Sequence, residues 1–282
     1  MSKLESEEGD LTRKQRREQA REERKAAEQA AAAGDARRKR MTQLGGAAVV
    51  VIVAIVVILV ATGGGGKKAA PQPGTKNSTT QKAIAEVTST IGGIPQKGNV
   101  LGSPTAPVTL QYFGDLECPF CREFTTSVLP TVIKKFVRTG KLQIQYRSLE
   151  TATREPEVFT TQQTAALAAG KQDKMWDFVE LFYHLQGEED SGYVTESYLQ
   201  GLAADVPGMD LAKWTSDRSD QTLQAQVATD TQEANNVGFT GTPSFLIGHS
   251  GGAMKKLEAS EYGNSFSDPS AFASAVEKLV KA

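Results

Sequence analysis

The chain has 282 residues, of which 39% are hydrophobic and 23% charged, so its average composition is that of a globular protein. Its 32 Lys and Arg residues nearly balance 33 Asp and Glu residues, and the net charge of −1 argues against a broad basic face for nucleic acid. Two cysteines are too few for a disulfide-dense scaffold or a four-thiolate metal site. Length alone favours about two domains, at roughly 150 residues each.

The first 40 residues differ in composition from the rest of the chain. They contain 12 basic and 9 acidic side chains and almost no large apolar ones, so they have a net charge of +3 while the remainder has −4. A segment of this kind forms a solvated helix or stays disordered. We expect a charged, soluble tail over 1–40.

An uncharged apolar run of 15 residues follows, from Ala47 to Ala61. Counted over 41–62, the segment has the length that a helix needs to cross a bilayer. A cleaved signal peptide is the competing interpretation, but the long charged segment before the run and the lack of a clean Ala-x-Ala cleavage site argue against it. Four consecutive basic residues, 37–40, precede the run, and only Lys67 and Lys68 follow it closely. The positive-inside bias therefore predicts a single-pass protein of the cell membrane, with a cytoplasmic N-terminus and an extracytoplasmic domain.

Residues 63–82 are rich in Gly, Pro, Ser and Thr and lack an apolar period. This composition is typical of a flexible tether, and we expect a flexible linker over 63–93. The folded domain is then expected over 94–282.

The pattern of that domain is mixed α/β. Alternating or apolar runs predict strands over 108–113, 142–146 and 241–247. Apolar spacing predicts a helix after the cysteine pair, kinked at Pro130 and closed by Gly140, and a final helix over 271–282. Residues 156–236 are predicted to be helical almost throughout. This order indicates one domain with a helical insertion at about 154–236, not two tandem domains.

The two cysteines enclose Pro119 and Phe120, between the first strand and the following helix. Two cysteines at this spacing can close and reopen a small disulfide ring, and a helix N-terminus favours the thiolate. We expect Cys118 to be the exposed, attacking sulfur and Cys121, one turn further on, to resolve the mixed disulfide. Pro119 suits the first turn because the N–H that it lacks would be unpaired there.

Two other interpretations of the cysteine pair remain. A purely structural disulfide would add little stability, because its ring is so small. A zinc site completed by His184 and His249 is arithmetically possible, but separations of 63 and 65 residues match no usual zinc-finger spacing. We therefore expect redox chemistry without a metal or another cofactor.

Several separated stretches resemble the DsbA-like branch of the thioredoxin-fold proteins: APVTLQYFGDLECPFCREF, then VLP, GKL and QYRSL, and much later GTPSFLIG. The resemblance covers about 94–282 and implies a thioredoxin-like α/β fold with an inserted helical domain. It also implies that Pro243 follows a cis peptide bond and lies against the cysteine pair. In that position the backbone of Thr242 would bind an extended substrate peptide.

The resemblance implies an enzyme, a thiol:disulfide oxidoreductase that exchanges a Cys118–Cys121 disulfide with the thiols of extracytoplasmic proteins. An oxidase with a membrane-bound reoxidising partner is the favoured form. A disulfide reductase or isomerase with the same site is an alternative, and a non-catalytic, membrane-anchored binding protein of thioredoxin fold is another.

Two positions depart from the family pattern. Tyr112 stands where many relatives have an acidic residue that assists proton transfer to the second thiol, and Asp115 and Glu117 are close without occupying that position. Phe120 stands where the strongest oxidants have His, and a neutral ring offers no positive charge to the Cys118 thiolate. We therefore expect a less extreme oxidant than those relatives.

Overall fold

A six-stranded mixed sheet organises the part of the chain that the computed structural model describes, residues 72–263 and 268–281. The strand order is β1-β2-β4-β3-β5-β6. Central strand β3 (Val108–Gly114) pairs in parallel with β4 (Leu142–Ser148) and antiparallel with β5 (Ser244–His249). The edges are formed by β1 (Gln96–Lys97) with β2 (Val100–Leu101), and by β6 (Met254–Lys256).

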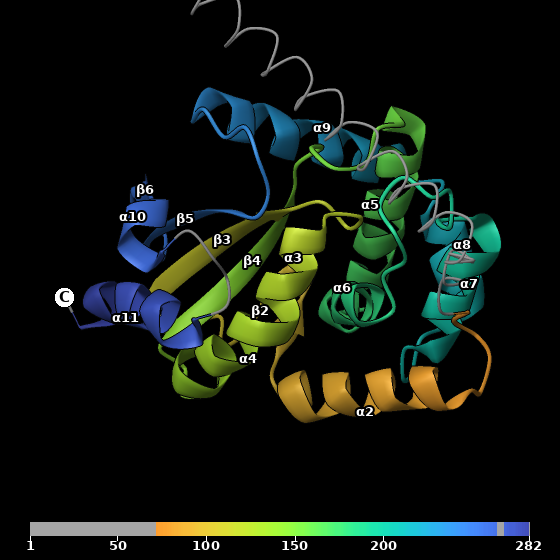
Figure 1. Ribbon diagram of the computed structural model, residues 1–282, viewed down its shortest axis with the longest axis horizontal. Coiled ribbons are helices and arrows are strands. Elements are labelled where there is room, and N and C mark those ends of the chain that lie inside the picture. Colours follow the sequence, from red (N-terminus) through yellow and green to blue (C-terminus); the bar gives the residue numbers. More distant parts are fainter. Residues whose placement is uncertain (1–71, 264–267, 282) are drawn as a thin grey trace, which may run out of the picture. The chain divides into compact units, whose positions relative to one another are not determined.

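Helices cover both faces of the sheet. One face is covered by the helix that contains Cys121 and by the last helix, α11 (Pro269–Val280). Between these helices and the sheet lies an aromatic cluster of Tyr112, Phe124, Phe245 and Phe272. On the other face, α9 (Gln221–Asn236) contributes Ala234 to a smaller core with Phe113 and Leu246. Figure 1 shows α9 and α11 on opposite sides of the strands. The layered α/β fold that the sequence predicted is confirmed.

The helix that begins directly after Cys118 and includes Cys121 consists of four consecutive segments. These are α3 (Pro119–Glu123), the π-helical η1 (Phe124–Val128), α4 (Leu129–Val132) and the π-helical η2 (Ile133–Val137). The widened turn just before Pro130 lets the Leu129 N–H donate to the carbonyl of Phe124. Pro130 has no N–H and cannot continue the backbone hydrogen bonds of the helix. The irregularity predicted at this proline is therefore present as a widened, π-helical turn.

Five helices lie between β4 and β5, in the segment expected to be a helical insertion: α5 (Pro156–Gly170), α6 (Met175–His184), α7 (Glu196–Asp205), α8 (Leu211–Asp217) and α9. Their packing buries Trp176 and Trp214 completely, and the indole of Trp214 donates to the carbonyl of Ala165. The short α10 (Ala259–Tyr262) and α11 then complete the described chain.

One prediction about the linker was wrong. Residues 78–91 form helix α2 (Ser78–Ile91), whose N-terminus is capped by Asn77, and Ala83, Val87 and Ile91 are buried against the domain core. These three apolar residues recur every four positions and so lie along one face of a helix. The Gly- and Pro-rich composition that suggested a flexible linker ends before this segment begins.

The tail 1–40 and the predicted membrane segment 41–62 lie outside the described residues. Within the described ranges, no helix combines the length and the apolar character that crossing a bilayer requires.

Candidate active site

Cys118 lies where the turn after β3 becomes helix α3. It is the N-cap residue, with an extended backbone at φ −70° and ψ 120°, and its Sγ accepts a hydrogen bond from the Cys121 N–H at 3.4 Å. Pro119 occupies the first turn, as predicted. Both cysteines are free thiols in this structure.

The exposure expected for Cys118 differs from the observed one. Its residue surface is only 3% exposed, and Cys121 is fully buried. The peptide bond between Thr242 and Pro243 is cis, as the resemblance implied, and it brings the Thr242 carbonyl to 3.3 Å from the Cys118 Sγ, which donates to it. The contact between residues 124 positions apart in the chain explains the burial, because the loop before β5 lies directly over the sulfur.

The two thiols have opposite acidities. Hydrogen bonding with the Cys121 side chain, and to a lesser degree with Thr242 and the backbone of the helix start, lowers the pKa of Cys118 to about 7, although burial opposes this shift. Burial, together with the neighbouring Cys118, raises the pKa of Cys121 well above its usual value. At neutral pH, Cys118 is therefore the sulfur that ionises, and it is both the better nucleophile and the better leaving group.

Tyr112 lies next to the buried Cys121. Its hydroxyl donates to the Cys121 carbonyl at 3.4 Å and lies 3.3 Å from the Thr125 hydroxyl. Burial raises the pKa of this phenol well above 10, so it stays neutral. Tyr112 therefore offers a neutral hydrogen-bonding group beside Cys121.

Asp115 organises the neighbouring loop. It is completely buried, and its Oδ2 accepts the backbone N–H groups of Thr151, Ala152 and Thr153 at 2.8–3.0 Å. Its Oδ1 accepts from the Thr153 hydroxyl and from the backbone N–H of Glu117. The carboxylate therefore joins the turn before Cys118 to the loop after β4.

Glu117 lies in a different environment. Burial raises the pKa of its carboxyl to about 7. It lines a cavity of about 410 Å³ together with Thr153, Arg154, Glu155 and Asp190. The cavity that Glu117 lines includes neither cysteine, so the carboxyl faces a space separate from the two sulfurs.

A groove of about 330 Å³ opens beside the cis-proline loop. It is lined by residues that include Phe120, Phe239, Thr242, Pro243 and Tyr262. The Phe120 ring is 61% exposed, so the apolar side chain of the Cys-Pro-Phe-Cys sequence projects into solvent next to the groove. A groove beside a nucleophile, with backbone groups at its edge, suits an extended peptide.

Sequence reasoning missed two residues of this site. The buried Gln186 donates from Nε2 to the carbonyls of Leu116 and Cys118, at 2.7 and 3.1 Å. Thr151 places its hydroxyl 2.5 Å from that of Thr242. Neither residue belongs to a recognisable motif, and both act across long separations in sequence.

The two histidines of the zinc alternative are not part of this site. His184 contacts Glu86, with 3.3 Å between Nδ1 and Oε2, and His249 is the last residue of β5. Among the residues that the structure describes, no three His, Cys, Asp or Glu side chains are arranged to hold a metal ion.

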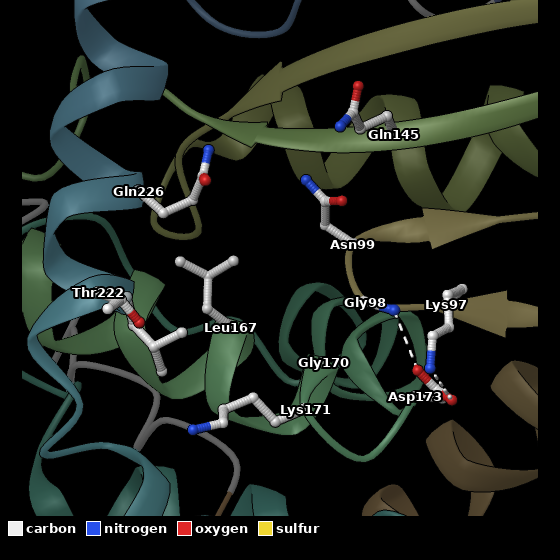
Figure 2. A pocket seen from close by; sticks show the side chains of 11 residues that line it. Lys97, Gly98, Asn99, Gln145, Leu167, Gly170, Lys171, Asp173, Thr222 and Gln226 are labelled. Carbon is white, nitrogen blue, oxygen red and sulfur yellow. Dashed lines mark hydrogen bonds and ion pairs between the residues drawn. The ribbon is translucent and has the colours of Figure 1, made fainter.

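A larger cavity, of about 510 Å³, lies away from the cysteines (Figure 2). It is bordered by Asn99, Gln145, Leu167, Gln226 and the Lys97–Asp173 ion pair. None of the site residues predicted from the sequence lines it.

A cysteine pair at a helix N-terminus, covered by a cis-proline loop on a layered α/β fold, defines a thiol:disulfide oxidoreductase of the thioredoxin superfamily. Residues 95–260 match the family model described as thioredoxin, and the chain belongs to this family. Its similarity is to the DsbA-like members.

The chain is 27% identical over 150 residues to the probable disulfide bond formation protein D of Bacillus cereus, covering 52% of this chain and 68% of that protein. A thioredoxin-like oxidoreductase from Silicibacter pomeroyi has a similar solved structure, with a TM-score of 0.50, 27% identity and coverage of 65% of this chain and 92% of that one. The crystal structure of oxidised BdbD from Bacillus subtilis shares the fold, with a TM-score of 0.55 at 22% identity, over 67% of this chain and 98% of that one.

Proposed function

We propose that this oxidoreductase is a protein disulfide oxidase of the cell envelope, with Cys118 and Cys121 as its redox pair. The observation that supports the proposal best is the contrast between the two thiols: Cys118 ionises near pH 7, while Cys121 is buried and has a raised pKa. An enzyme whose reduced form includes a stabilised thiolate gives up its disulfide readily, because that thiolate is a good leaving group.

The reaction starts from the Cys118–Cys121 disulfide. A substrate thiolate attacks the Cys118 Sγ, forms a mixed disulfide and releases Cys121, which takes up a proton. A second substrate thiolate then attacks the substrate sulfur of the mixed disulfide and expels Cys118 as a thiolate. Two electrons pass from the substrate to the enzyme, which is left as the dithiol and needs reoxidation by a membrane-bound partner.

Thr242 and Pro243 are proposed to bind the substrate. The Thr242 carbonyl already contacts the Cys118 Sγ, so a peptide that pairs with this backbone places its own sulfur at the reacting atom. The groove beside Phe120 accommodates the rest of the extended segment.

The extracytoplasmic, membrane-anchored placement is proposed from the sequence. The apolar 41–62 segment and the basic residues before it support this placement. Fusion of reporter enzymes after residue 282 tests the topology. Activity from a reporter that works only in the cytoplasm would contradict the extracytoplasmic placement.

Trapping with Cys121→Ser tests the redox role. In this variant the Cys118 thiolate can still attack a substrate disulfide, but Cys121 is no longer there to release the mixed disulfide that forms. Substrate adducts therefore accumulate on Cys118, and mass spectrometry identifies them. Cys118→Ser is the matched control and accumulates none by this route. Full complementation of a deletion strain by the double Cys→Ser variant would contradict catalysis and favour a non-catalytic binding protein.

The direction of electron flow needs its own experiment. An oxidase restores disulfides in a reduced, unfolded test protein, while a reductase or isomerase acts only on substrates that already contain disulfides. Equilibration with a glutathione series then gives the potential. Because Phe120 is neutral, we expect a less oxidising couple than DsbA, and a value as high as roughly −120 mV would contradict this.

A further inference from the structure

The Thr151 side chain contacts the same loop that contacts Cys118. It lies in the loop after β4, and its Oγ1 is 2.5 Å from the Oγ1 of Thr242, 91 residues away in sequence. Either hydroxyl can be the donor in this pair. The contact joins two loops that meet only in the folded domain.

Thr242 contacts Cys118 through its backbone and affects the acidity of the thiol through its side chain. Its carbonyl oxygen accepts from the Sγ of the thiol form, at 3.3 Å. Its side chain lowers the pKa of Cys118, after the larger effect of Cys121. The carbonyl of Thr242 thus binds the thiol, and the side chain of the same residue favours the thiolate.

Loss of the proton from Cys118 changes which hydrogen bonds the sulfur can form. A thiolate cannot donate to the Thr242 carbonyl, but it can accept from the Thr242 hydroxyl. That hydroxyl has one proton, which can point either to the sulfur or to Thr151. If Thr151 donates its own proton to the Thr242 Oγ1, the Thr242 proton is free to face the sulfur.

Asp115 fixes Thr151 in the position for this role. The Thr151 backbone N–H donates to the Asp115 Oδ2 at 3.0 Å, and the next two residues of the loop donate to the same oxygen. Because Asp115 also accepts from the Glu117 N–H, one carboxylate aligns the loop of Thr151 with the turn that leads into Cys118.

We propose that Thr151 is a positioning residue that donates to the Thr242 hydroxyl, turns the proton of that hydroxyl toward Cys118 and so favours the thiolate. The inference rests on the assignment of Cys118 as the reactive sulfur. Thr151 acts on that sulfur only through Thr242.

The test compares Thr151→Val and Thr151→Ser in the full, reduced chain. The rate of Cys118 alkylation by iodoacetamide is followed from pH 5 to pH 9 by mass spectrometry. Because a neutral hydrogen bond contributes modestly, we expect Thr151→Val to slow alkylation about threefold at pH 6 and to leave the rate at pH 9 unchanged. Thr151→Ser keeps the hydroxyl and should retain the wild-type profile.

Thr109→Val is the matched control, because Thr109 forms a similar hydroxyl pair with Ser250, at 2.8 Å, on the far end of β3. It should leave the profile unchanged. A Thr151→Val profile that superimposes on wild type would overturn the inference, and so would an equal shift in Thr151→Ser. Absence of preferential alkylation at Cys118 in the wild-type chain would instead overturn the assignment of the reactive cysteine, and the inference with it.

Discussion

Gln186 donates a hydrogen bond to the backbone carbonyl of Cys118, with 3.1 Å between Nε2 and O. The same nitrogen donates to the Leu116 carbonyl at 2.7 Å, and the residue is buried. Gln186 follows helix α6, so the inserted helices directly support the turn that presents the reactive sulfur. The Cys118 carbonyl is also the acceptor for the Arg122 N–H at the start of the helix.

Gln186→Leu should therefore destabilise the domain by about 1–3 kcal/mol, because two buried carbonyls lose a donor that water cannot replace. Urea unfolding measures the change. Gln172→Leu is the control, since its partly exposed side chain also bonds the main chain, at Asp210, and its loss should cost less than the loss of the buried Gln186. Equal effects of the two substitutions would contradict the buried role.

Alkylation should distinguish the two cysteines sharply. The pKa of Cys118 is lowered to about 7, so its reaction rate should rise through pH 7 and level off above it. Cys121 is fully buried, and its pKa is raised well above the usual value, so it should react only after unfolding. Peptide mass spectrometry of the reduced protein measures both rates. Comparable labelling of the two thiols in the folded chain at pH 7 would refute this assignment.

Phe120→His should make the enzyme a stronger oxidant. A protonated imidazole beside the sulfur stabilises the thiolate, and we expect the pKa of Cys118 to fall by about one unit and the potential to rise by about 30 mV. Titration of the thiolate and equilibration with glutathione measure the two effects. Phe120→Leu controls for loss of the aromatic ring, and an equal change in both variants would show that charge is not the cause.

Glu117 should make stability depend on pH. Burial raises the pKa of its carboxyl from 4.5 to about 7, so the folded protein retains this proton more tightly than the unfolded chain does. The stability that this group contributes is therefore complete below pH 4.5 and is lost as the pH rises through 7. Relative to Glu117→Gln, the wild type should lose about 1–3 kcal/mol between pH 4.5 and pH 8.

Urea unfolding at the two pH values measures this difference for Glu117. Glu155→Gln, which changes an exposed side chain at the same cavity, is the control and should retain the loss of stability that Glu117 causes. A constant stability difference between wild type and Glu117→Gln across this range would contradict the raised pKa.

Local patterns were sufficient to predict the central elements. The runs over 108–113 and 142–146 are β3 and β4, which continue to Gly114 and Ser148 through residues that are all buried. The strand predicted over 241–247 begins later, at Ser244, because the cis bond at Pro243 precedes it. The mixed fold followed from the order of these runs, and the cis bond followed from the family resemblance.

The support around the cysteines could not be predicted in the same way. Gln186 and Thr151 contact the site across 68 and 91 residues, and glutamine and threonine are common residues without a distinctive pattern. The burial of Cys118 depends on where the loop before β5 lies, which is a tertiary contact. Helix α2 was missed for a different reason: a linker was inferred from average composition, although Asn77 and the apolar spacing after it were a local helix signal.

The contact between Cys118 and Thr242 also has a consequence for biosynthesis. Cys118 leaves the ribosome 124 residues before Thr242, whose loop contacts it, and strand β5, which pairs with one side of β3, comes later still. During that interval the loop that contacts Cys118 has not yet been made, and neither has the backbone that we propose to bind a substrate peptide. Synthesis therefore separates the appearance of the thiols from the appearance of the loop that we propose to bind substrate, and a chain that stops before that loop keeps the thiols without this proposed binding site.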